Sequence, residues 1–114
     1  MRLIGEAVEV ARAHDVEIRL LLLPSKESVY REDLAAVLGD AAAADVLRSE
    51  LEAYRRICEF AAAQNTLCYD LTDDLRRAAV TADAPLYFPP DTHWNALGSV
   101  VVADLVAAWL DPTP

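Results

Sequence analysis

Two short apolar segments, residues 16–23 and 66–70, lie between longer segments of helical periodicity, and this alternation constrains the fold more than any other feature. The first segment ends in the continuous apolar run 20–23, which Pro24 then stops. Such a run predicts a strand that is buried on both faces, as in a parallel sheet covered by helices. Because helices and strands alternate along the chain, the sequence predicts an α/β fold.

The segments around these strands are predicted to be helical because apolar residues recur at spacings of three and four. Gly39 and Asn65 are expected to end the second and third helices. Thr72 and Asn95 are expected to cap the fourth and fifth, since their side-chain oxygens can accept hydrogen bonds from backbone N–H groups. The predicted helices cover residues 2–13, 31–38, 41–64, 72–80 and 96–110.

Size and charge limit both the number of domains and the class of partner. The 114 residues, 54% of them apolar, predict a single domain or most of one. A net charge of -9 and the single lysine, Lys26, argue against a nucleic-acid partner, because phosphate binding needs clustered positive charge. No apolar run approaches the roughly 20 residues that span a bilayer, so we expect no membrane contact from this segment.

The two cysteines, Cys58 and Cys68, allow one disulfide bond or none. Both lie within apolar patterns, where cysteine commonly behaves as a small buried hydrophobic residue. We therefore expect two free, buried thiols, and the cysteines leave the cellular compartment open.

The stretch 87–95 places a carboxylate and an imidazole two residues apart on a stiffened approach to a helix. Pro89 and Pro90 restrict the backbone, so Asp91 is expected to arrive on a nearly extended segment. Asp91 could then hold His93 in one tautomer and stabilise its protonated form, as the acid of a catalytic triad does. These two residues are the candidate catalytic pair.

Two other interpretations of this stretch stay open. Asp91 and Asn95 could simply make local capping bonds near the helix start, with Trp94 packed beneath the helix and His93 on the surface. Asp91 and His93 could also bind a metal ion. No third ligand stands at a recognisable spacing, however, so we expect no metal site.

Further polar residues follow the two predicted strands, and open α/β sheets bind ligands beyond such strand ends. Lys26 could bind an anionic substrate or stabilise an oxyanion there, or it could be a solvated surface lysine. Tyr30 could line the same cleft or pack beneath the following helix. Asp70 is better explained by turn and cap bonds. A Gly-x-Ser turn, which would expose a nucleophile, is missing around the four serines, Ser25, Ser28, Ser49 and Ser99.

The run Leu21 to Tyr30 and the Asp-Thr-His-Trp-Asn segment at 91–95, followed by Gly98, share a pattern with a known family. Together they resemble the SGNH hydrolase-like domain of the alginate O-acetyltransferase type. In that family a strand ending in Pro-x-Lys-x-x-x-Tyr precedes Asp-Thr-His-Trp-Asn, a Gly and a helix. The resemblance runs through most of the chain, and the Asp-Thr-His-Trp-Asn segment is its most specific part.

The resemblance implies a three-layer α/β/α sandwich with a parallel sheet, present here as a single partial domain over residues 1–114. It implies a polysaccharide O-acetyltransferase or acetylesterase without a cofactor, in which Asp91 and His93 take the acid and base positions. The nucleophilic serine of the family comes later, in a Gly-x-Ser turn that has no match here. We therefore expect the chain alone to be inactive.

The expected partners follow from the same resemblance. A carbohydrate or acyl substrate would contact Lys26 and Tyr30, which stand at the predicted strand end. The family acts outside the cytoplasm, which implies a periplasmic or extracytoplasmic location. A non-catalytic domain that binds carbohydrate or protein is the alternative function. An uncovered sheet edge would also favour self-association of the isolated chain.

Overall fold

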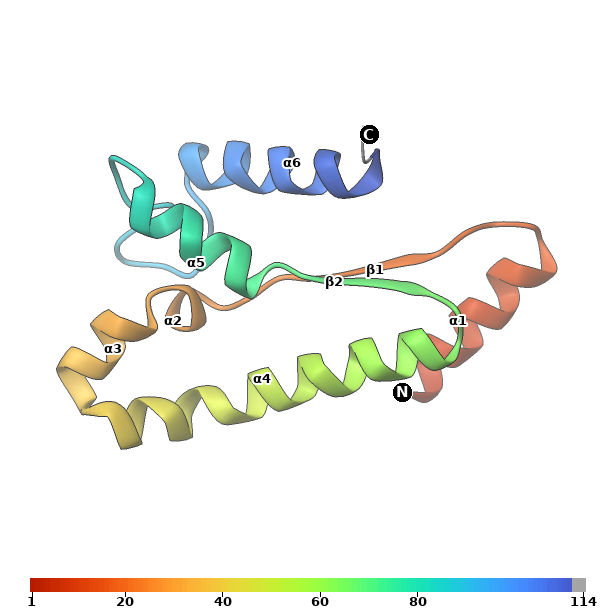
Figure 1. Cartoon of the computed structure of the whole chain (residues 1–114), viewed down its shortest axis with the longest axis horizontal. Helices are drawn as coiled ribbons and strands as arrows, with labels where there is room; N and C mark the ends of the chain where they lie inside the picture. The colour runs from red at the N-terminus through yellow and green to blue at the C-terminus, as the bar shows by residue number, and fades with distance from the viewer. Residues whose placement is uncertain (112–114) are drawn as a thin grey trace.

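In residues 1–111, which the computed structural model describes, helices lie around a small parallel sheet (Figure 1). This mixed helix and strand order agrees with the predicted α/β alternation. The elements are α1 (Arg2–Ala13), β1 (Arg19–Leu22), α2 (Lys26–Val29), α3 (Arg31–Leu38), α4 (Asp40–Ala63), β2 (Leu67–Asp70), α5 (Thr72–Thr81) and α6 (Ala96–Leu110).

The sheet consists of β1 and β2, paired in parallel with Arg19 opposite Leu67 and Leu22 opposite Asp70. Both strands are shorter than predicted. All four β1 residues are half-buried, so the expected burial on both faces was wrong. With only two strands in the described residues, neither strand has neighbours on both sides, and its side chains stay partly open to water.

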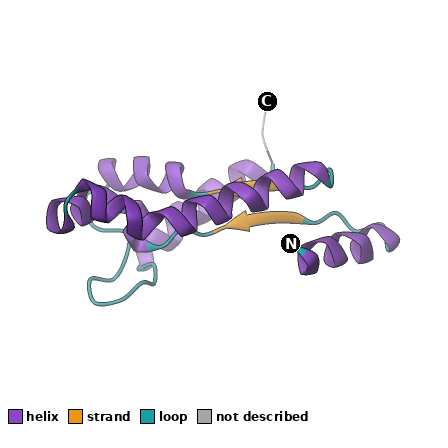
Figure 2. Ribbon diagram, turned by 90° about the horizontal axis from the view of Figure 1, so that it is seen from below, coloured by secondary structure: helices purple, strands orange, loops and turns teal. Residues whose placement is uncertain are grey.

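Helices lie on both sides of these strands, with α4 on one side and α5 and α6 on the other (Figure 1). Helix α4 runs along the sheet, as the view from below also shows (Figure 2). On the other side, the Trp109 ring of α6 lies 5.3 Å from the Tyr69 ring of β2, centroid to centroid. The Arg19 guanidinium stands over the same indole and donates to the Leu110 carbonyl at 3.3 Å.

The buried core lies at the carboxyl end of the strands rather than under their middle. It joins Val29 of α2, Leu75 of α5, Val102 of α6 and the loop residues Leu86 and Tyr87. Leu75 and Leu86 are fully buried, and Tyr87 is 1% exposed. The loop between α5 and α6 is therefore anchored in this buried cluster through Leu86 and Tyr87.

The overall shape is elongated, which shows how much apolar surface stays open. The radius of gyration is 16.0 Å, whereas a compact domain of this length would have about 13 Å. Helix α6 is apolar on nearly all sides, and its Leu97, Val100 and Leu110 remain exposed. The three-layer sandwich expected from the sequence would need a larger sheet than the two strands that residues 1–111 form.

The predicted helix ends are mostly confirmed. Asn65 has a positive φ of 53° after α4, and the Asn95 side chain accepts from the Gly98 N–H at 2.9 Å. The cap at Thr72 was wrong, because Thr72 lies inside α5 and its backbone N–H donates to Asp70 Oδ1 at 2.9 Å. The carboxylate accepts more strongly than a hydroxyl at this helix start. The short helix α2 was not predicted.

The expectation of free thiols was also wrong, because Cys58 and Cys68 form a disulfide bond with a Cα–Cα distance of 5.3 Å. The turn at Gln64 and Asn65 reverses the chain between α4 and β2. It brings a helix residue and a strand residue that lie 10 positions apart to bonding distance. Periodicity along the chain does not reveal a pairing of this kind.

Breaking this disulfide should lower the stability of the protein. Closing a loop of this size restricts the unfolded chain, so the Cys58→Ser, Cys68→Ser double variant should lose about 2–3 kcal/mol of unfolding free energy. Urea unfolding with and without reductant measures the effect. The chain has no other cysteine, so the reductant acts at this bond alone. An unfolding midpoint that reductant does not move would contradict the bond's contribution.

Candidate functional site

The loop from Leu86 to Asn95 is held closed by backbone contacts. Tyr87 and Trp94 form an antiparallel bridge, and the Phe88 N–H donates to the His93 carbonyl at 3.0 Å. The Asn95 N–H donates to the Leu86 carbonyl, also at 3.0 Å. The loop therefore forms a narrow hairpin whose tip carries the two prolines and Asp91. The expected extended approach to Asp91 was wrong, because Pro89 and Pro90 lie in a turn that the Asp91 N–H closes by donating to the Phe88 carbonyl at 3.3 Å.

The candidate catalytic pair is assembled at this tip. Asp91 Oδ1 lies 2.9 Å from Nδ1 of His93 and also accepts from the His93 backbone N–H. An ionised carboxylate only accepts, so Nδ1 carries the proton in this contact, and in the neutral imidazole Nε2 keeps its lone pair. The His93 backbone N–H, helped by the imidazole, holds the pKa of the Asp91 carboxyl below its usual range.

The imidazole is open to incoming groups. The His93 side chain is 82% exposed. A neutral histidine with Nε2 free can take a proton from a hydroxyl that is brought within hydrogen-bond distance. The arrangement is thus chemically able to work as an oriented general base.

Lys26, the first residue of α2, reaches the same loop from the carboxyl end of β1. Its Nζ donates to the carbonyls of Phe88 at 2.9 Å and Pro89 at 2.8 Å, and lies 3.5 Å from the carbonyl of Asp91. The structure thus brings together two sequence stretches that lie more than 60 positions apart.

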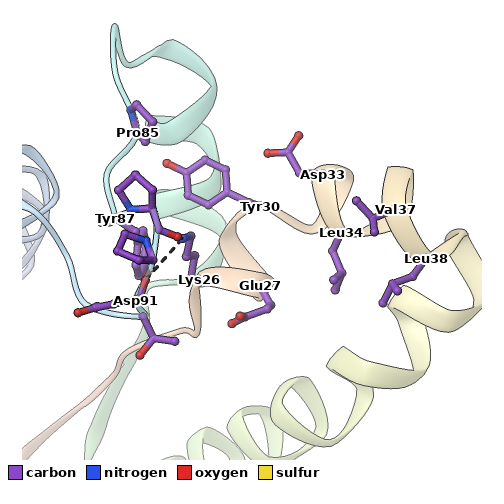
Figure 3. A pocket seen from close by; sticks show the side chains of 13 residues that line it. Lys26, Glu27, Tyr30, Asp33, Leu34, Val37, Leu38, Pro85, Tyr87 and Asp91 are labelled. Atoms are coloured by element: carbon purple, nitrogen blue, oxygen red, sulfur yellow. Dashed lines mark hydrogen bonds between the residues drawn. The ribbon is translucent and has the colours of Figure 1, made fainter.

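A cavity of about 590 Å³ lies between this loop and helices α2 and α3 (Figure 3). Lys26, Tyr30 and Asp91 line it on one side, and the α3 residues Leu34 and Val37 stand across from them. His93 is not among the lining residues. Three of the four predicted site residues therefore share one cavity, and the fourth is bonded to its rim through Asp91.

Tyr30 combines packing with a polar contact. Its ring meets the Tyr87 ring edge to face, with centroids 6.0 Å apart. Its hydroxyl oxygen accepts from the Leu86 N–H at 2.8 Å. Because the oxygen is used as an acceptor there, the hydroxyl hydrogen is left to donate to a ligand in the cavity.

Other candidates from the sequence stand apart from this pair. Asp70 binds the start of α5, through the backbone N–H and hydroxyl of Thr72. Ser28 is 1% exposed, and the Ser99 hydroxyl donates to the Asn95 carbonyl. No serine in residues 1–111 forms a hydrogen bond with His93.

Residues 1–111 contain neither a metal-ligand cluster nor a membrane-spanning helix. Within residues 1–111, no three His, Cys, Asp or Glu side chains are grouped as metal ligands would be. No helix over those residues combines the length and apolar character needed to cross a bilayer.

Sequence reasoning missed the contacts by which Asn95 and Gly98 hold the loop in place. Asn95 caps α6 with its side-chain oxygen while its Nδ2 donates to the Pro85 carbonyl at 2.5 Å. Gly98 lies against the loop so closely that an added Cβ would stand 2.0 Å from the Leu86 carbonyl oxygen. Both residues belong to the 91–98 motif, but only the folded backbone shows their contacts with Pro85 and Leu86.

The chain matches a known protein family over its whole length. The family model described as SGNH hydrolase-like domain, acetyltransferase AlgX, matches residues 1–114. No curated protein and no solved structure matches the chain. The family match spans both α2 and the 86–95 loop, which together build the site described above.

Proposed function

The chain belongs to the family of SGNH hydrolase-like domains of the acetyltransferase AlgX, and we propose that it supplies the acid and base of an acyl-transfer site. One observation carries this proposal. Asp91 Oδ1 and His93 Nδ1 are 2.9 Å apart, and the imidazole is exposed. This contact orients the ring so that Nε2 can act as the base.

In the proposed reaction, a serine hydroxyl gives its proton to Nε2 of His93 while its oxygen attacks the acyl carbonyl. The leaving group takes the proton from the imidazolium, and the acyl group stays on the serine oxygen. A sugar hydroxyl or water then attacks this ester, again losing its proton to Nε2 of His93, and the serine oxygen leaves with the proton that the imidazolium returns. Asp91 stabilises the imidazolium at each step.

We propose that the serine comes from a segment other than these 114 residues. The serines here are buried, bonded elsewhere or without a Gly-x-Ser turn. The His93 side chain is 82% exposed. A serine in such a turn could therefore approach the imidazole from the solvent side.

The substrate proposed is a polysaccharide hydroxyl or its acetyl ester, bound in the cavity beside Asp91. Tyr30 lines this cavity, and because its hydroxyl oxygen accepts from the Leu86 N–H, its hydrogen can donate to a sugar oxygen. Transfer and hydrolysis share the acyl-enzyme and differ only in which hydroxyl resolves it. The disulfide between Cys58 and Cys68 supports an oxidising, extracytoplasmic location.

The larger fold is part of the proposal. The exposed apolar side of α6 and the two-stranded sheet support a three-layer sandwich in which further strands, from another segment or another copy, extend this sheet. Self-association of the isolated chain would be one way to cover the same surface.

A second candidate function is a domain that binds carbohydrate without catalysis. It is favoured by the position of the cavity, whose lining includes Tyr30 and Asp91 but not His93. In that case the Asp91–His93 contact would only stiffen the loop.

The proposal predicts that the 114-residue chain by itself has no esterase turnover, because a histidine without a serine has no acyl-enzyme route. A longer form that includes a Gly-x-Ser turn should cleave a small acetyl ester. Release of the alcohol from p-nitrophenyl acetate by the two forms measures this. Sustained turnover by the short chain would contradict the assigned roles, and a longer form without turnover would favour the binding domain.

A further inference from the structure

We propose that Lys26 is a positioning residue, whose ammonium group holds the loop that carries Asp91 and His93. A role of Lys26 in catalysis rests on the proposed function. Its role in holding the loop rests on its contacts alone. Lys26 Nζ meets three backbone carbonyls of this loop, those of Phe88, Pro89 and Asp91.

The shortage of backbone N–H donors at the loop tip explains how the Lys26 ammonium stabilises the loop. Pro89 and Pro90 have no N–H, so the loop tip has more carbonyl acceptors than backbone donors. The Asp91 N–H donates to the Phe88 carbonyl at 3.3 Å, which serves only one of these acceptors. The Lys26 ammonium offers three donors and one positive charge, which serve the Pro89 and Asp91 carbonyls and add a second donor to the Phe88 carbonyl.

The ammonium can hold the loop because its own backbone is fixed. Ser25 caps α2 by accepting from the Ser28 N–H at 3.2 Å, and the Ser25 N–H donates to Glu50 Oε1 of α4 at 2.9 Å. Ser28 and Val29 are almost fully buried. Lys26 thus extends from an element that is tied to both α4 and the core.

This arrangement differs from a substrate-binding lysine. Lys26 Nζ lies within 2.9 Å of the Phe88 and Pro89 carbonyl oxygens and 3.5 Å from that of Asp91, so these acceptors can take all three ammonium donors. Little donor capacity is left for an anionic substrate. Fixing the backbone of Asp91 instead fixes the direction of its carboxylate, and through it the ring of His93.

The test is a nuclear magnetic resonance comparison of the 114-residue chain and three variants. Lys26→Met removes the donors and the charge while keeping a long side chain. Arg31→Met removes one positive charge from a residue of α3 that has no contact with the loop among the hydrogen bonds and ion pairs of residues 1–111. Lys26→Arg restores charge and donors.

The readouts are the tautomer of His93 from its imidazole nitrogen shifts and the exchange rate of the His93 backbone amide. In Lys26→Met we expect a mixture of tautomers and amide exchange faster by about tenfold, as when hydrogen bonds to a charged group are lost. Arg31→Met should match the wild-type protein, and Lys26→Arg should recover part of the effect. A His93 tautomer and amide rate unchanged in Lys26→Met would overturn the proposal.

Two further observations keep the test decisive. If Lys26→Met does not fold, the wild-type protein should show Overhauser contacts between Lys26 side-chain protons and Pro89, and their absence would overturn the proposal. In an active longer form, Lys26→Met should lower kcat with KM little changed, whereas a raised KM alone would mean substrate binding. The spectra need no turnover, so failure of the acyl-transfer proposal would be seen separately.

Discussion

Replacing Gly98 with alanine should destabilise the protein by about 3 kcal/mol or more, because the new methyl group has no space. Its Cβ would stand 2.0 Å from the Leu86 carbonyl oxygen and 3.2 Å from Cβ of Trp94. The Leu86 carbonyl cannot simply move, since it accepts from the Asn95 N–H at 3.0 Å and Leu86 is fully buried. Either α6 shifts away from the loop or the hairpin opens.

Gly5 offers a matched control for this substitution. It also lies in a helix, α1, but an added Cβ there would find its nearest neighbour, the end of the Phe60 ring, at 3.4 Å. Gly5→Ala should therefore be neutral or stabilise the protein by up to about 1 kcal/mol, through helix propensity. Urea unfolding of both variants gives the comparison. Equal midpoints for Gly98→Ala and the wild-type protein would show that the contact with Leu86 is not restrictive.

The sequence predicted those features whose causes lie within a few residues of one another. The start of α6 was predicted because the Asn95 side chain caps an N–H only three positions away. The end of α4 shortly before Asn65 follows from a similarly local cause, the tolerance of asparagine for a positive φ. The Asp91–His93 contact was also predictable, because the two residues are separated by a single position.

Features that depend on distant parts of the chain were missed. The disulfide between Cys58 and Cys68 depends on how β2 returns along α4, which no periodicity reports. The carbonyls that receive the Lys26 ammonium lie 62 to 65 positions further along. The partial burial of β1 depends on how many strands pair with it. The sequence of β1 itself does not reveal that number.

Asp91→Asn and His93→Ala should each lower kcat by roughly a thousandfold or more in a form of the protein that includes the Gly-x-Ser turn. Alanine removes the base. Asparagine loses the charge that stabilises the imidazolium and can offer an N–H where Nδ1 needs an acceptor. The Asp91 side chain is about half exposed, at 47%, and that of His93 is 82% exposed, so the fold should persist. Circular dichroism and urea unfolding check this point.

The most direct test of the central claim is kcat for acetyl-ester cleavage by that longer form, measured side by side for the wild-type protein and His93→Ala. If His93 is the base, the variant should retain no more than about a thousandth of the wild-type kcat while unfolding at the same urea concentration. A His93→Ala protein with wild-type kcat would contradict the claim. Asp91 and His93 would then be no more than a capped and stiffened start of α6.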